Sequence, residues 1–112
     1  MTAAELIERY NAGERDFAGA DLSGTNLSGA ILTGADLRWA DLSSANLTKA
    51  DLCDAALTNA ILCRANLCGA ILDGVDLTGV ILTGADLCGA NLTGTVIRLG
   101  NRRFSLTRRP EE

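Results

Sequence analysis

The chain has 112 residues, of which 47% are hydrophobic and only 4% aromatic, a formal net charge of −4 and no histidine. This length corresponds to one small domain. The absence of histidine excludes imidazole acid–base pairs, Ser-His-Asp and Cys-His nucleophile systems, and zinc sites that need a histidine ligand. With so few aromatic side chains, the core cannot be built around large aromatic residues. It must therefore come from small units that are repeated many times. We therefore expect a protein that is not an enzyme and uses no cofactor.

Residues 1–14 are predicted to form a helical cap. Thr2 together with Glu5 fits a capping box, and Gly13 is placed to end the helix. One apolar stripe runs along the predicted helix: Leu6, Ile7 and Tyr10. We expect this stripe to cover the first repeats as a lid, with a helix for a membrane surface or a partner as the alternative.

Residues 15–99 repeat with a period of five. Leu occupies the central position of every unit from Leu22 to Leu92, usually with Ala two positions before it and Gly two positions after it. Side chains two residues apart share one side of a strand, so Ala and Leu are predicted to point inward together. A glycine with positive φ can then turn the chain, as the third position of a type II turn requires. Each unit is therefore predicted to be a short strand plus a corner, in coils stacked about 4.8 Å apart.

The residue before each Leu indicates how many units complete a coil. At an offset of 20 residues the following identical residues align: Asn26, Asn46 and Asn66; Asp16 and Asp36; Asp21 and Asp41; Ile61 and Ile81. At an offset of 15 residues the matches are confined to Asp21, Asp36 and Asp51. Four units per coil are therefore favoured, which gives an all-β solenoid with four walls.

The repeat also resembles a known family. The units that carry the resemblance are ADLSG (20–24), ADLRW (35–39), ANLTK (45–49) and ANLCG (65–69). They resemble the pentapeptide-repeat family over about 16 units, and the opening MTAAELIERYNAGERDFAGADLSG is similar to the start of small cyanobacterial members. The resemblance implies a right-handed quadrilateral β-helix with four pentapeptides per coil, here about four coils behind the N-terminal helical cap.

Two outward features predict local geometry and charge. Six successive corners lack glycine, and we expect them to use a turn that does not demand positive φ: Trp39, Ser44, Lys49, Asp54, Asn59 and Arg64. Asp residues that are 20 positions apart would be stacked, and such carboxylates are expected to raise one another's pKa. With no general acid, base or pocket beside them, these aspartates are assigned to structure and solubility.

Five outward residues are candidates for a protein-interaction surface: Arg38, Trp39, Ile61, Cys63 and Ile81. Trp39 beside Arg38 has the composition of a binding hot spot, although Trp39 could instead lie flat on its neighbours and shield the backbone. Ile61 and Ile81 would stack on one wall beside Cys63, and a contiguous apolar wall suggests a contact. Simple β propensity is the alternative reason for isoleucine at these positions.

The four cysteines follow a central Leu and are predicted to face outward: Cys53, Cys63, Cys68 and Cys88. Without an export signal we expect reduced thiols. Cys68 and Cys88 are 20 residues apart and would be stacked, which makes them the candidate redox pair, although parallel side chains are poorly aimed for a disulfide. No metal site is expected, because the C-x-x-C spacing is missing.

Charge divides the chain into an acidic body and a basic tail, residues 100–112. Residues 16–94 carry nine Asp against three basic residues, a charge of −6, whereas residues 95–112 carry five Arg against two Glu, a charge of +3. An acidic body repels nucleic acid, so a nucleic-acid partner is not expected. The tail either folds over the final coil or leaves that coil to meet a second copy, which would give a homodimer through an end coil.

These patterns together predict a non-enzymatic structural or protein-interaction module that presents rigid, flat β-helix faces to an unknown protein partner. The family offers an alternative, since other members mimic duplex DNA and bind topoisomerases such as gyrase. Against this alternative, four coils rise only about 20 Å and the body charge is modest. No signal peptide and no run of 18 apolar residues is found, so we expect a cytoplasmic protein without a membrane partner.

Overall fold

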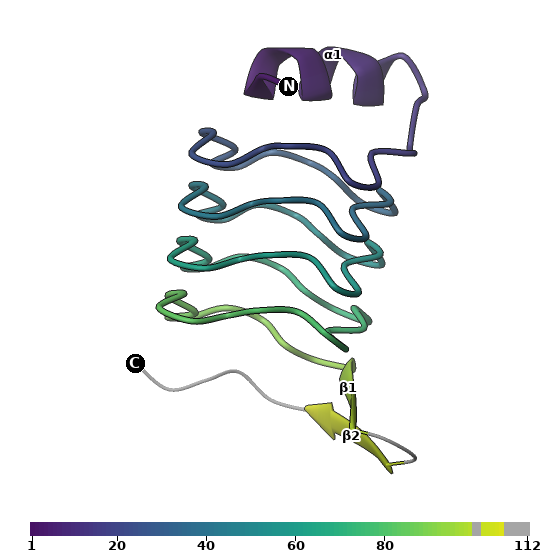
Figure 1. Ribbon diagram of the computed structural model, residues 1–112, viewed down its shortest axis with the longest axis vertical. Coiled ribbons are helices and arrows are strands. Elements are labelled where there is room, and N and C mark those ends of the chain that lie inside the picture. The colour runs from purple at the N-terminus through teal and green to yellow at the C-terminus, as the bar shows by residue number, and fades with distance from the viewer. Residues whose placement is uncertain (100–101, 107–112) are drawn as a thin grey trace.

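The computed structural model describes residues 1–99 and 102–106, with side chains through Arg98. The chain begins with the helix α1 (Ala3–Asn11), continues in short bridged segments, and ends in the antiparallel strands β1 (Thr95–Leu99) and β2 (Arg102–Leu106). Figure 1 shows α1 at one end of a stack of coils and the β1–β2 hairpin at the other. Residues 100–101 and 107–112, which are the remainder of the predicted tail, lie outside the described residues.

Helix α1 covers the amino-terminal end of the stack. The Thr2 hydroxyl accepts the Glu5 N–H at 3.1 Å, and the Glu5 carboxylate accepts the Thr2 N–H at 3.2 Å, which confirms the predicted capping box. Leu6 is fully buried against the core, and the Tyr10 hydroxyl donates to the Thr33 carbonyl at 2.7 Å. The apolar stripe therefore faces the coils, as predicted.

Parallel backbone bridges join residues 20 positions apart, from Asp16 with Asp36 to Asp76 with Val96. At the first bridge, the Phe17 N–H donates to the Asp36 carbonyl at 2.9 Å and the Asp36 N–H donates to the Arg15 carbonyl at 2.8 Å. This register confirms four units per coil. The coils comprise residues 15–34, 35–54, 55–74 and 75–94.

Each coil has four walls, which we number by the column of residues that precede the central Leu. Wall 1 holds Asp16, Asp36, Ala56, Asp76 and Val96. Wall 2 holds Asp21, Asp41, Ile61 and Ile81. Wall 3 holds Asn26, Asn46, Asn66 and Asp86, and wall 4 holds Ile31, Asp51, Ile71 and Asn91. Wall 2 is therefore opposite wall 4.

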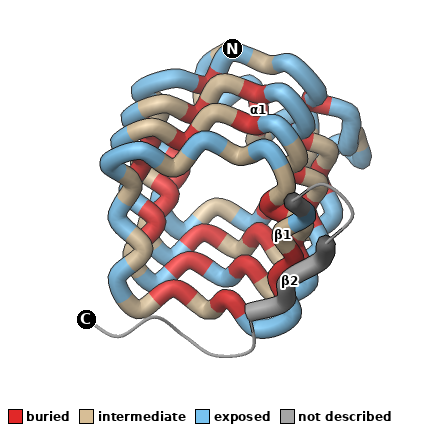
Figure 2. The backbone as a smooth tube through the Cα atoms, turned by 60° about the horizontal axis from the view of Figure 1, so that its bottom comes forward, coloured by how far each residue is buried: buried red, intermediate tan, exposed pale blue. Residues whose placement is uncertain are grey.

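The interior is made by Ala and Leu, as the repeat predicts. Leu42 and Leu62 are 0% and 1% exposed, and Figure 2 shows buried residues in stripes that run from coil to coil. Burial weakens in the 75–94 coil, where Leu82, Ala85 and Leu87 are only half-buried. The reason is that no further coil covers them among the described residues.

The expectation for the six corners without glycine is wrong. Their φ angles lie between 58° and 63°, close to the values of the glycine corners. Hydrogen bonds between coils hold this conformation at each of these six corners: the Trp39 N–H donates to the Thr58 carbonyl at 3.2 Å, and the Lys49 N–H to the Cys68 carbonyl at 2.9 Å. A left-handed conformation costs about 1–2 kcal/mol for a residue with a side chain, and it persists where the surrounding structure fixes it.

A local hydrogen bond explains the Asp and Asn residues that precede Leu. Every Asp and Asn in the four columns accepts a hydrogen bond at its Oδ1 atom from the backbone N–H of the residue two positions later. The N···Oδ1 distances are 2.9 to 3.2 Å. This is the Asx-turn geometry that Asp and Asn favour. These side chains therefore shape the approach to each corner, a role that our sequence analysis did not identify.

Candidate interaction surface

Wall 2 carries an apolar stack in its later coils. Ile61 and Ile81 are paired in a parallel bridge, with Asp41 on the other side of Ile61. Ile81 is 47% exposed, and Ile61 is half-buried. Cys63 follows on the same wall and is half-buried. Isoleucine cannot form the Asx turn, so these two positions lose that bond and present a branched apolar side chain instead.

The corner between walls 1 and 2 is occupied by Trp39, which is 58% exposed. Arg38, the residue before it, binds both carboxylate oxygens of Asp36, from Nε to Oδ1 at 2.9 Å and from Nη2 to Oδ2 at 2.8 Å. Its guanidinium carbon lies 5.6 Å from the centre of the Trp39 ring. The bidentate contact to Asp36 therefore holds the guanidinium close to the indole, a pairing of cation and aromatic face.

The structure brings the five predicted interaction residues onto two adjoining walls. Ile61, Cys63 and Ile81 lie on wall 2, Trp39 marks its edge, and Arg38 lies just across that edge. We call these five residues the Trp39–Ile81 surface. Wall 4 offers a contrast, because its exposed isoleucines, Ile31 and Ile71, are separated by Asp51 and form no stack.

Charge on walls 1 and 2 departs from the sequence expectation. The Ser23 hydroxyl donates to Asp21 at 2.7 Å and, with the Ser23 N–H, lowers the pKa of that carboxyl. The side-chain hydrogen bond from Arg38 is the main cause that lowers the pKa of Asp36. The expectation that stacked aspartates raise one another's pKa is therefore wrong for Asp21 and Asp36, because hydrogen bonds from local donors stabilise the charged carboxylates.

The four cysteines are free and lie on three walls: Cys53 on wall 4, Cys63 on wall 2, and Cys68 and Cys88 on wall 3. The predicted redox pair is therefore brought together on one wall, while the other two cysteines stand apart from it. Within residues 1–99 and 102–106, no group of three or more Cys, Asp or Glu side chains is arranged to hold a metal ion.

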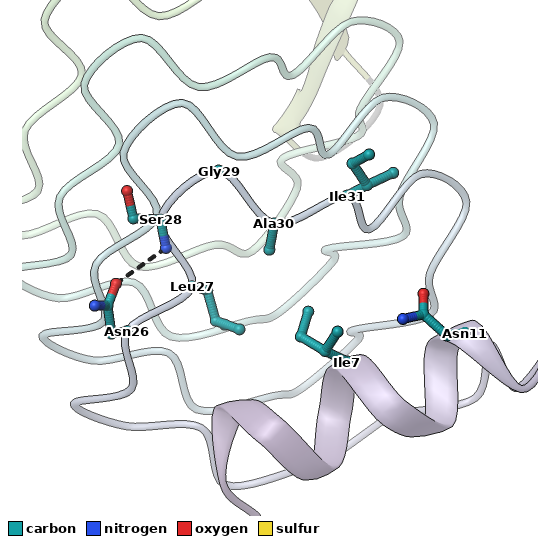
Figure 3. Close-up of a pocket in the computed structure, with 8 residues that line it drawn as sticks. All are labelled: Ile7, Asn11, Asn26, Leu27, Ser28, Gly29, Ala30 and Ile31. Atoms are coloured by element: carbon teal, nitrogen blue, oxygen red, sulfur yellow. Dashed lines mark hydrogen bonds between the residues drawn. The ribbon is translucent and has the colours of Figure 1, made fainter.

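A groove of about 380 Å³ lies between α1 and the first coil. Figure 3 shows Ile7 of the helix facing Leu27 and Ala30, with Ile31 and Asn11 at the far side. The lining residues are Ile7, Asn11 and residues 26–31, so no acidic or basic side chain is among them. This groove was not predicted from the sequence, in which the available signal was Ile31, an apolar residue at a position that usually holds Asp or Asn.

A family profile described as pentapeptide repeats matches the chain with eight copies, over residues 16–48, 45–84 and 70–98. The chain belongs to the pentapeptide-repeat family. No helix among the described residues of this pentapeptide-repeat protein combines the length and hydropathy that a membrane span requires. No curated protein matches the sequence at a significant level.

Several solved structures of pentapeptide-repeat proteins from cyanobacteria are similar to the chain. HetL of Nostoc sp. PCC 7120, described as involved in heterocyst differentiation regulation, is 38% identical over 73% of this chain and 40% of its own, with a TM-score of 0.43. The protein alr5209 of Nostoc is 34% identical over 87% of this chain and 96% of its own, with a TM-score of 0.45. Rfr23 of Cyanothece 51142 is 38% identical over 74% of this chain and 60% of its own, with a TM-score of 0.42. The chain thus spans less than two thirds of HetL and Rfr23.

Proposed function

We propose that this protein is a non-enzymatic interaction module that binds a protein partner through the Trp39–Ile81 surface. Pentapeptide-repeat proteins are generally structural or interaction modules. The observation that carries the proposal is the exposure of Trp39 and Ile81, 58% and 47%, on walls that adjoin at one corner. An exposed Trp beside an Arg is the composition of binding hot spots, and the apolar pair Ile61 and Ile81 lies on the adjoining wall, one and two coils further along.

The coil architecture makes this surface rigid before binding. Residue 61 donates its N–H to Ala40 and accepts from Leu42, so its backbone is fixed by the preceding coil. Arg38 is already held by Asp36 and Trp39. Binding therefore orders few side chains, and this preorganisation lowers the entropic cost of association.

Charge near the surface indicates the chemistry of the partner. Wall 2 begins with Asp21 and Asp41 and ends with Ile61 and Ile81, so the acidic and apolar halves of one flat wall adjoin. We propose a partner with an apolar patch bordered by basic side chains, since complementary charge sets the orientation of a complex and its rate of association.

The test compares two double variants of the immobilised protein in capture from the native cell extract. The wall 2 variant is Trp39→Ala with Ile81→Ser, and the control is Ile31→Ser with Ile71→Ser on wall 4, where isoleucines are also exposed. Circular dichroism first establishes that both variants are folded. We expect the wall 2 variant to lose the partner that the parent and control capture. Equal capture by both variants, or loss only in the control, contradicts the proposal.

We also propose that a second copy of the chain covers the 75–94 coil. The N–H groups of Leu82 and Leu87 find no acceptor in residues 1–99, and both side chains are half-buried, whereas the equivalent leucines of the other three coils are buried. An open strand edge with apolar side chains favours association. Sedimentation over a range of concentrations is expected to show a dimer, with Leu87→Arg monomeric. A monomer at all concentrations would contradict the dimer and favour the other expectation, that the tail, residues 100–112, covers the 75–94 coil.

The alternative function is binding of a topoisomerase such as gyrase by mimicry of DNA. Asp16, Asp36 and Asp76 on wall 1 supply the acidic column that favours it. Against it, Ala56 interrupts this column and Arg38 pairs with Asp36 at 2.8 Å. Supercoiling by gyrase in the presence of excess protein tests this alternative. If the protein neither inhibits nor protects gyrase, the alternative is eliminated.

A further inference from the structure

Cys68 and Cys88 lie one coil apart on the outside of wall 3. Their register is fixed on both sides: Asn66 pairs with Asp86, and the Gly69 N–H donates to the Cys88 carbonyl at 2.8 Å. Strands in this arrangement are about 4.8 Å apart, which lies within the Cα range of disulfides. Each of the other cysteines stands on a different wall.

The Cys68 thiol is influenced by the next coil, because Asp86 and Cys88 contribute to its raised pKa after burial, which is the main cause. Asp86 precedes Cys88 by two residues, and its Oδ1 atom accepts the Cys88 N–H at 3.0 Å. Because Asn66 pairs with Asp86, Cys68 and Cys88 follow paired residues at the same distance along neighbouring coils.

We propose that Cys68 and Cys88 form a reversible intramolecular disulfide that ties the 75–94 coil to the 55–74 coil, with a small-molecule disulfide as the oxidant. The thiolate of one cysteine attacks the oxidant, forms a mixed disulfide and releases one thiol. The second cysteine loses its proton, attacks the protein sulfur of the mixed disulfide and releases a second thiol. Two protein thiols are thereby oxidised and one disulfide reduced to two thiols.

The two thiols differ in their surroundings, which assigns the order of these steps. Cys88 is exposed and Cys68 is half-buried. Burial is the main cause that raises the pKa of the Cys68 thiol, followed by the effects of Asp86 and Cys88. Cys88 is therefore the entry thiol, and Cys68 is the resolving thiol.

The position of the pair gives the bond a mechanical effect. The 75–94 coil is the less buried end of the described stack, with Leu82 and Leu87 half-buried. A bond between coils closes a loop of 20 residues and reduces the freedom of that coil when it opens. Because stacked side chains are not ideally placed for a disulfide, the bond carries strain and is reduced readily, which is typical of regulatory disulfides.

The test uses the full chain in glutathione buffers, with Cys53→Ser/Cys63→Ser as the background so that the pair alone remains. We expect oxidised glutathione in excess to remove both remaining thiols of the monomer, with Cys68 linked to Cys88 in the peptide map, and excess reduced glutathione to restore them. Retention of both thiols, or a link between two molecules, overturns the proposal.

Single variants in the same background test the order of the steps. Cys68→Ser is expected to stop at a mixed disulfide with glutathione on Cys88, because no resolving thiol remains. Cys88→Ser is expected to react about tenfold more slowly at Cys68. Asp86→Asn is expected to move the pH profile of disulfide closure to lower pH. Equal reaction rates of the two single variants, or an unchanged pH profile, contradict the assigned roles.

Discussion

The side chain of Asn59 lies over Gly79, one coil further along the stack, and its Oδ1 atom fills the space that a Cβ at position 79 would need. Both residues are corners with positive φ, 63° at Asn59 and 74° at Gly79. At Gly24 the φ is similar, 67°, but nothing lies within 4 Å of the Cβ position. Two glycines with similar backbone conformation therefore have different surroundings.

This difference predicts unequal effects of alanine at the two corners. Gly24→Ala is expected to lower the free energy of unfolding by about 1–2 kcal/mol, through backbone strain alone. Gly79→Ala is expected to lower it by at least about 1 kcal/mol more, because its Cβ meets Asn59. In urea unfolding, the double variant Asn59→Gly/Gly79→Ala should lose this additional cost. Equal costs at positions 24 and 79 would show that the Asn59 side chain moves away freely.

The left-handed corners without glycine predict that some substitutions increase stability. Ser44 has a φ of 58°. Ser44→Gly removes the strain of that conformation but increases the freedom of the unfolded chain, so we expect a net gain of up to about 1 kcal/mol in thermal or urea unfolding. Ser44→Ala keeps the strain and should leave stability nearly unchanged. A loss on Ser44→Gly would mean that the corner is not strained.

The fold could be predicted from the sequence because the repeat is redundant. Alternation within each five-residue unit predicted the inward sides, and the identical residues at an offset of 20, more numerous than those at an offset of 15, indicated a 20-residue coil, which the bridges confirm. The corner conformation could not be predicted from residue type. Local propensity argues against positive φ at Trp39, whereas the hydrogen bonds between coils that impose it are known only once the register is known.

The candidate surface could be predicted in composition but not in detail. The coil length of 20 residues places Ile61 next to Ile81 in neighbouring coils. The five-residue repeat places Trp39 at a corner between two walls. The contact of Arg38 with Asp36 depends on side-chain rotamers, and the effect of Asp86 on the pKa of Cys68 crosses from one coil to the next. The groove beside Ile7 depends on how α1 lies on the first coil, which no periodicity encodes.

Burial along the stack predicts a gradient in the cost of core substitutions. Leu42 is completely buried, whereas Leu87 is half-buried in the 75–94 coil. Leu42→Ala should lower the free energy of unfolding by about 2–5 kcal/mol, since it removes buried methyl groups and leaves a cavity. Leu87→Ala should cost clearly less in dilute protein, measured by urea unfolding. Equal costs in dilute protein would show that Leu87 is covered within the single chain.

The pairing of Asp36 with Arg38 predicts a dependence of stability on pH. The Arg38 side-chain hydrogen bond lowers the pKa of Asp36 below its ordinary value of 3.8, so the pair stabilises the fold above that value and loses its effect as pH falls through the lowered pKa. Arg38→Gln should therefore be less stable than the parent near neutral pH, by a small amount because the pair is partly exposed. The difference should vanish in acid. A difference that stays constant down to acid pH would assign the effect to packing of the Arg38 stem.

Asp73 on wall 4 predicts a stabilising substitution of another kind. Its Oδ1 atom is buried and has no hydrogen-bond partner among the described residues, whereas Thr33 and Thr93 occupy the equivalent positions of other coils. An orphaned buried acceptor costs about 1–3 kcal/mol, so Asp73→Thr should raise the free energy of unfolding by about 1 kcal/mol. Asp73→Asn, which removes the charge but keeps a buried acceptor, should gain less in the same urea titration. If Asn gains as much as Thr, repulsion from the neighbouring Asp51 and Asp54, rather than the orphaned oxygen, limits stability at this site.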